Sequence, residues 1–188
     1  METTACPTER AFTVNEYHRL ADAGILRATD RVELMNGRIY AMPPIGTGHA
    51  ECVRLLTDLM YARIASRARV SVQNPIRLDD RSEPEPDLAL LDPAGDYLGC
   101  HPHPRDVLLL IEVSDTTLDF DLHEKTPLYA RAGIREVWVV ALGDERVHVF
   151  REPGRDGYAW HRVFRRGDTL QVGGFPDTGF AVEEVLGS

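Results

Sequence analysis

Apolar residues recur along the chain with two periods, one typical of helices and one typical of strands. Helical spacing predicts an amphipathic helix of about four turns over 49–65. Alternation on either side of Asn36-Gly37, the strongest short hairpin signal, predicts two strands within 31–42. A Ser/Thr-x-x-Glu pair with capping-box spacing begins a shorter helix over 13–21. The first third of the chain therefore combines two helices with a hairpin.

The later pattern predicts a sheet with one helical crossover. Apolar runs predict strands over 70–78 (interrupted or edged at Pro75), 88–91, 107–113, 136–142, 146–151 and 158–164. A helix is predicted within 119–132, and a turn-rich tail from Gly173 ends in a short helix over 182–186. A strand, helix and strand over 107–142 imply a right-handed crossover between parallel neighbours. We therefore expect an α/β fold, a mixed β-sheet flanked by helices, and not a full doubly wound domain.

Composition adds limits on size and location. The 188 residues are 43% hydrophobic and 27% charged, which fits one domain with an adequate core. The longest apolar run, Val107–Ile111, is far shorter than the ~20 residues of a membrane span. Three cysteines without a CxxC pair argue against a disulfide framework or a zinc ribbon. We expect a single cytoplasmic domain over 1–188 that is not associated with a membrane.

Charge restricts how the chain could bind nucleic acid. It has 21 Lys and Arg against 30 Asp and Glu, a formal net charge of −9. A protein that holds nucleic acid by general attraction is normally basic. A nucleic-acid role therefore needs a local site where metal ions offset carboxylates. No GxGxxG, GxxxxGK[ST] or GxSxG motif supports nucleotide binding or a serine hydrolase.

Lys125 is the only lysine, whereas the other 20 basic residues are arginine. A compositional bias toward arginine explains most of this pattern. An ammonium group is nevertheless a compact charge with a tunable pKa, which a guanidinium cannot replace. The single lysine is therefore either a chance survivor or a functional residue.

Two acids precede Lys125 in positions suited to metal chemistry. Asp87 follows a proline directly before an apolar strand, and Glu112 interrupts the most apolar strand. Carboxylates on neighbouring strands can bind Mg²⁺, which needs only one or two of them plus substrate phosphate. A nearby lysine would orient water or stabilise charge on the phosphate. The alternatives are that both acids are solvated and that Lys125 pairs with Asp121 four residues earlier on a helix.

These residues carry a resemblance to a known family. Glu33 in VELMNG, Pro86-Asp87, Glu112-Val-Ser114, and the segment 121–125 followed by LYARAGIREVWVV resemble the Uma-type restriction endonucleases of the PD-(D/E)xK nuclease superfamily. The resemblance covers nearly the whole chain, from the first helix to about Val149. It implies a restriction-endonuclease-like fold and a Mg²⁺-dependent phosphodiesterase site.

The resemblance also implies roles for matching positions. Asp87 and Glu112 would bind the metal, and Lys125 would supply the amine from the next helix. Ser114 stands where the superfamily's usual lysine would be. Glu33 would be an auxiliary acid near the metal, and Asp121 belongs to the same motif.

Thr126-Pro127 departs from the family pattern, because proline destabilises a helix interior by ~3 kcal/mol. Either the helix begins near Thr126, with Lys125 at its edge, or it kinks there. His49 is a candidate for contact with phosphate or for support of the site, the alternative being an ordinary histidine near a helix start. His101 and His103 are expected to be loop residues, because the sequence shows no further zinc ligands at regular spacing.

The sequence thus predicts a Mg²⁺-dependent endonuclease, with Mn²⁺ able to substitute, that hydrolyses phosphodiester bonds in DNA. Cutting two strands favours a homodimer, with residues 145–164 as a candidate partner surface. The alternative is a non-catalytic binding module on the same fold, in which the acids form only a weak cation site. A metal-independent small-molecule enzyme has no supporting motif.

Overall fold

The computed structural model describes residues 9–27 and 29–187. The helices are α1 (Val14–Asp22), α2 (Thr47–Arg63), η1 (Pro104–Asp106), α3 (Leu118–Phe120), η2 (Asp121–Lys125), α4 (Thr126–Ala132) and α5 (Val182–Leu186). The strands are β1 (Val32–Met35), β2 (Arg38–Ala41), β3 (Arg69–Val72), β4 (Leu88–Leu91), β5 (Val107–Ser114), β6 (Glu136–Ala141), β7 (Arg146–Gly154), β8 (Gly157–Arg165), β9 (Thr169–Val172) and β10 (Phe175–Ala181).

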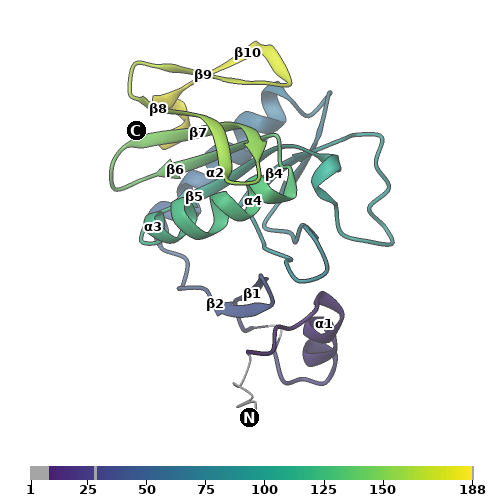
Figure 1. The fold of residues 1–188 in the computed structure, drawn as a ribbon. Helices are drawn as coiled ribbons and strands as arrows, with labels where there is room; N and C mark the ends of the chain where they lie inside the picture. Colours follow the sequence, from purple (N-terminus) through teal and green to yellow (C-terminus); the bar gives the residue numbers. More distant parts are fainter. Residues whose placement is uncertain (1–8, 28, 188) are drawn as a thin grey trace, which may run out of the picture.

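A six-stranded mixed sheet forms the centre of the fold, in the order β3-β4-β5-β6-β7-β8. Strands β5 and β6 are parallel, and the other neighbours are antiparallel. The crossover between β5 and β6 runs through α3, η2 and α4, as predicted (Figure 1). Apolar residues of α2 and α5 pack in one core cluster and those of α4 in another. The predicted mixed sheet flanked by helices is confirmed.

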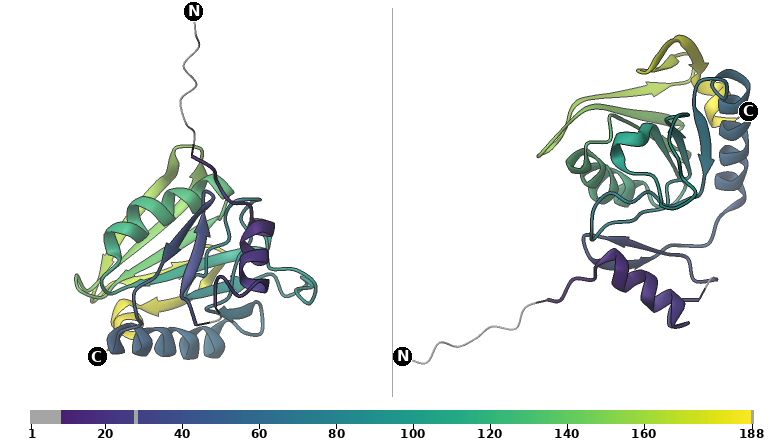
Figure 2. Two further views of the ribbon diagram at one scale, coloured as in Figure 1. Left: turned by 90° about the horizontal axis from the view of Figure 1, so that it is seen from below. Right: turned by 90° about the vertical axis from the view of Figure 1, so that its right-hand side faces the viewer.

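The predicted N-terminal elements form a unit beside the sheet. Thr13 and Glu16 make the capping box of α1. Asn36 and Gly37 both have positive φ, which a tight hairpin turn between β1 and β2 requires. The backbone N–H of Glu83 donates to the carbonyl of Leu34 at 2.7 Å and so joins β1 to the segment before β4. Figure 1 and the right-hand view of Figure 2 show α1 and this hairpin together below the sheet.

The crossover helix accommodates Pro127 through a π-turn. Segment η2 is π-helical, and α4 begins at Thr126 with Pro127 in its first turn. Proline lacks an N–H, and a first turn leaves that donor unneeded. The Thr126 hydroxyl donates to the carbonyl of Asp121 at 2.7 Å. Lys125 therefore lies at the junction of the two segments, directly before α4.

Two predicted elements differ from the structure. The strand expected over 70–78 ends at Val72, because Gln73 has a φ of 49° that leaves the extended region. The tail expected to be only turn-rich contains β10, which pairs antiparallel with β9. The predicted helix over 49–65 lies at Thr47–Arg63.

Among the described residues, no helix combines the length and apolar character that crossing a membrane requires.

Candidate active site

Four elements bring the predicted residues to one pocket. Asp87 directly precedes β4, Glu112 lies in β5, Lys125 ends η2, and Glu33 lies in β1. All four side chains are buried and line a pocket of about 150 Å³. Segments more than 90 residues apart in the sequence thus supply one site.

The Lys125 amine lies between two carboxylates. Its Nζ donates to Glu33 Oε1 at 3.1 Å and to Glu112 Oε1 at 3.2 Å. Burial alone would lower the pKa of Lys125, but the charges of Glu112 and Glu33 outweigh that effect and raise the pKa. The alternative prediction, that Lys125 pairs with Asp121, is wrong, because the amine donates to Glu33 and Glu112 instead. The amine stays protonated and acts as a cationic hydrogen-bond donor.

Glu112 has a second donor that sequence reasoning missed. The Tyr129 hydroxyl donates to Glu112 Oε1 at 2.5 Å. Burial raises the pKa of Glu112 well above its usual value, against the opposing charge of Lys125. Tyr129 follows Lys125 by four residues, a spacing that places both on one helix face. That spacing is the signal by which Tyr129 could have been found.

Asp87 is held by three donors or potential donors. The backbone N–H of Val113 donates to Asp87 Oδ2 at 2.8 Å. A hydrogen bond of 3.1 Å joins His49 Nε2 to the same oxygen, and the Gln73 amide lies 3.5 Å from Oδ1. His49 therefore contacts Asp87, one of the predicted site residues. Gln73 was not singled out by the sequence.

Ser114 and Asp121 bind each other beside the pocket. Ser114 Oγ and Thr117 Oγ1 each donate to Asp121 Oδ2 at 2.7 Å. Burial raises the pKa of Asp121, although Lys125 and these two hydroxyls act in the opposite direction. Asp121 also lines the pocket. Ser114 thus positions an acid of the crossover.

The donor set of the pocket suits a hard divalent cation. The pocket-lining acids are Glu33, Glu85, Asp87, Glu112, Asp115 and Asp121, against Arg31, His49 and Lys125. Burial raises the pKa of Glu33 and Glu85 as well, although the positive charge of Lys125, and for Glu85 also that of Arg31, acts in the opposite direction. Within the described residues, these acids do not form a group of three ligand atoms within 4.8 Å of one another. An ion held by one or two carboxylates and waters fits this arrangement, and that is the preference of Mg²⁺.

The sheet order and the helices on its two faces define a restriction-endonuclease-like fold, with an acid-lined pocket beside β4 and β5. The chain belongs to the Uma2 family, described as "Putative restriction endonuclease", whose family model matches residues 14–183.

A solved structure with a similar fold supports this assignment. A structure described as a "putative nuclease belonging to DUF820" from Anabaena variabilis is 15% identical to this chain, with a TM-score of 0.72. The match covers 93% of this chain and 97% of the other. The type IIG restriction endonuclease BpuSI gives a TM-score of 0.43 at 18% identity, over 81% of this chain and 17% of the enzyme. No curated protein matches the sequence.

Proposed function

We propose that this protein is a Mg²⁺-dependent endonuclease, able to use Mn²⁺, that hydrolyses phosphodiester bonds in DNA. The observation that supports this most is the convergence of Lys125 with Glu33 and Glu112 in the pocket that Asp87 also lines. Membership of the Uma2 family supports the same class of activity. We further propose a single cytoplasmic domain that acts as a homodimer.

Asp87 and Glu112 are the proposed metal ligands. A bound Mg²⁺ would polarise the scissile phosphate and lower the pKa of a coordinated water. Val113 and His49 orient the Asp87 carboxylate, whereas Tyr129 and Lys125 orient that of Glu112. Lys125, held protonated by two acids, would stabilise negative charge that develops on the phosphate oxygens.

A cleavage assay tests the proposal. Purified protein is mixed with supercoiled plasmid, single-stranded DNA or RNA at low salt, with Mg²⁺, Mn²⁺ or EDTA. We expect metal-dependent cleavage of DNA that Asp87→Asn and Glu112→Gln reduce by about 100-fold or more. The exposed residue His123 provides a matched control, since His123→Gln leaves the pocket unchanged. Cleavage that survives both acid substitutions would contradict the proposal.

Two observations favour a second candidate, a non-catalytic binding module. The Lys125 amine already donates to two acids, and the net charge of −9 opposes binding of polyanions. Under this alternative, no metal or substrate gives cleavage, while the folded protein still binds a partner. The same assay, combined with a binding measurement, separates the two functions.

A further inference from the structure

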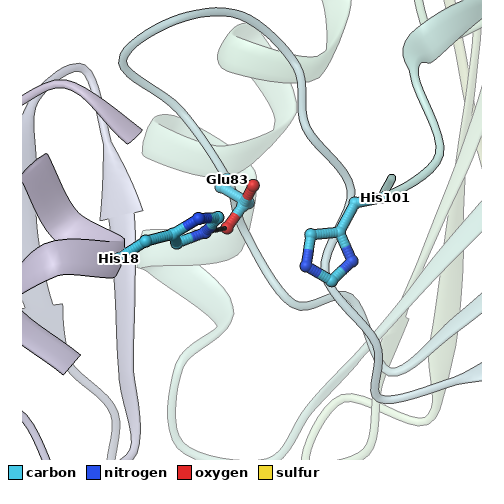
Figure 3. Close-up of side chains that lie close together, drawn as sticks. All are labelled: His18, Glu83 and His101. Carbon is cyan, nitrogen blue, oxygen red and sulfur yellow. Dashed lines mark hydrogen bonds and ion pairs between the residues drawn. The ribbon is translucent and has the colours of Figure 1, made fainter. Parts of the chain in front are cut away.

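Three potential metal ligands from distant parts of the chain meet outside the pocket. His18 comes from α1, Glu83 from the segment before β4, and His101 from the loop before η1 (Figure 3). One ligand atom from each lies within 4.8 Å of the other two. Over residues 9–27 and 29–187, this is the one such group of three. We propose that it binds a divalent transition-metal ion of the Zn²⁺ type.

The three ligand atoms lie near enough to one another to share one ion. His18 Nε2 lies 2.5 Å from Glu83 Oε1, and the rings of His18 and His101 are 6.2 Å apart at an angle of 72°. Tetrahedral zinc places its nitrogen and oxygen ligand atoms roughly 3.3 Å apart. Figure 3 shows the three side chains pointing toward one another. Small side-chain rotations would therefore bring all three to one ion.

Glu83 provides a second and independent observation. Its side chain is only 3% exposed, and its Oε2 atom has no hydrogen-bond partner. A buried carboxylate oxygen without a partner destabilises the folded protein. The contact of Glu83 with His18 explains Oε1 alone and does not explain the position of His101. A cation bound by all three residues would account for both features.

Backbone hydrogen bonds hold each ligand segment in place. The N–H of Val14, at the start of α1, donates to the carbonyl of Asp80 at 2.8 Å. The N–H of Arg77 donates to the carbonyl of Pro102, next to His101, at 2.9 Å. Glu83 is fixed through its N–H bond to Leu34. The site is thus built on anchored backbone, which favours a defined coordination geometry.

The ligand types select the ion. Two imidazoles and one carboxylate suit Zn²⁺ and related transition metals, whereas Mg²⁺ prefers oxygen ligands only. Three protein ligands leave a fourth position for water. The side chains of His18, 45% exposed, and of His101 both reach the surface, so an ion can enter from solvent. An ion bound there would link α1 and the loop that carries His101 to the segment that carries Glu83. That segment pairs with β1 at Leu34, the residue next to Glu33.

Zinc titration of the untagged, metal-free full chain tests this proposal, which does not depend on nuclease activity. Calorimetry should give one equivalent of bound Zn²⁺ that excess Mg²⁺ does not displace. The thermal unfolding midpoint should rise by several degrees, because the ion binds the folded state. When Co²⁺ replaces Zn²⁺, the visible absorption spectrum should be that of a four-coordinate ion with nitrogen and oxygen ligands.

Matched variants locate the ion. His18→Ala and His101→Ala should each weaken Zn²⁺ binding by more than about tenfold, since loss of even a supporting residue costs roughly 10- to 100-fold. Asp87→Asn, Cys100→Ser and His123→Ala should bind as the unmodified chain does. If His18→Ala fails to fold, His101→Ala, in an exposed loop, decides the question.

Three outcomes would overturn the proposal. One is a folded chain that binds no Zn²⁺. Another is binding that survives both histidine substitutions. The third is binding that Asp87→Asn or Cys100→Ser abolishes, which would place the ion in the pocket or on the thiol.

Discussion

Lys125 is the shared counter-ion of two buried acids, Glu33 and Glu112. The sequence could single it out as the only lysine, and the family resemblance could suggest its role. Its partner Glu33 lies 92 residues away, so no local pattern could predict that contact. Helical spacing suggested Asp121 instead. That pairing does not form, because Asp121 accepts hydrogen bonds from Ser114 and Thr117.

Removal of the Lys125 amine should destabilise the whole fold. Lys125→Ala leaves Glu33 and Glu112 buried without their shared cation, and such a loss costs about 3–5 kcal/mol. Urea denaturation followed by circular dichroism measures the free energy of unfolding. Arg135→Ala, at an exposed position before β6, serves as a control that should change it by less than about 0.5 kcal/mol. A loss below about 1 kcal/mol in Lys125→Ala would show that the ion pairs contribute little.

At the scale of helices and strands, the sequence predicted those elements whose geometry depends on neighbouring residues. The β1–β2 hairpin was predicted because the Asn-Gly turn needs two positive φ angles that these residues tolerate. The β9–β10 pair was missed because Gly173, Gly174 and Pro176 read as turn residues. Its strands are held in part by distant contacts, such as the Gly173 N–H donated to Glu136 Oε2 at 2.7 Å.

The tight turn of the hairpin gives a sharp test at this scale. Gly37 has a φ of +78°, and a Cβ there would lie 2.5 Å from the Cβ of Ala11. Gly37→Ala should therefore destabilise the protein by about 2 kcal/mol or more. Gly143→Ala is the matched control, because a Cβ at Gly143 would meet nothing within 4 Å. Equal unfolding midpoints of the two variants in urea would contradict this account of the turn.

Strands β7 and β8 carry a stacked pair of imidazoles that predicts a pH dependence. His148 Nδ1 lies 3.2 Å from His161 Nε2, and the His161 ring stacks on Phe150 at 4.2 Å. Burial lowers the pKa of both imidazoles, and for His148 the neighbouring His161 adds to the effect. Unfolded imidazoles bind protons near pH 6.5, before the folded ones do. This pair should therefore cost stability as the pH falls below about 6.5.

Urea midpoints between about pH 7.5 and 5.5 check this prediction. Buried acids with raised pKa values, such as Glu112, act in the opposite direction, because the folded state then binds more protons. The comparison with His148→Phe isolates the imidazole contribution, since only that term changes. The unmodified chain should lose more stability than His148→Phe, and His123→Gln should behave as the unmodified chain. Parallel curves for all three would exclude a role for the stack.

For the whole molecule, periodicity and the handedness of crossovers were enough to predict a mixed sheet with a parallel β5–β6 pair. The candidate site could be predicted only in part. Asp87, Glu112 and Lys125 stand out from their local surroundings, whereas Gln73 and the contact of His49 with Asp87 depend on how distant segments pack. The meeting of His18, Glu83 and His101 has the same origin.

The overall charge leads to a prediction about nucleic-acid binding. With a net charge of −9 and an acid-lined pocket, the chain should contact DNA through a small local surface only. A site that neutralises about two phosphates loses roughly tenfold in affinity between about 50 and 200 mM salt, whereas 6–10 contacts lose about 10³–10⁵. Fluorescence anisotropy with a labelled duplex in EDTA, where metal-dependent cleavage is blocked, measures this dependence. We expect weak binding with the shallow dependence. A loss of a thousandfold or more would instead indicate an extended basic interface, formed by the arginines that are spread along the chain.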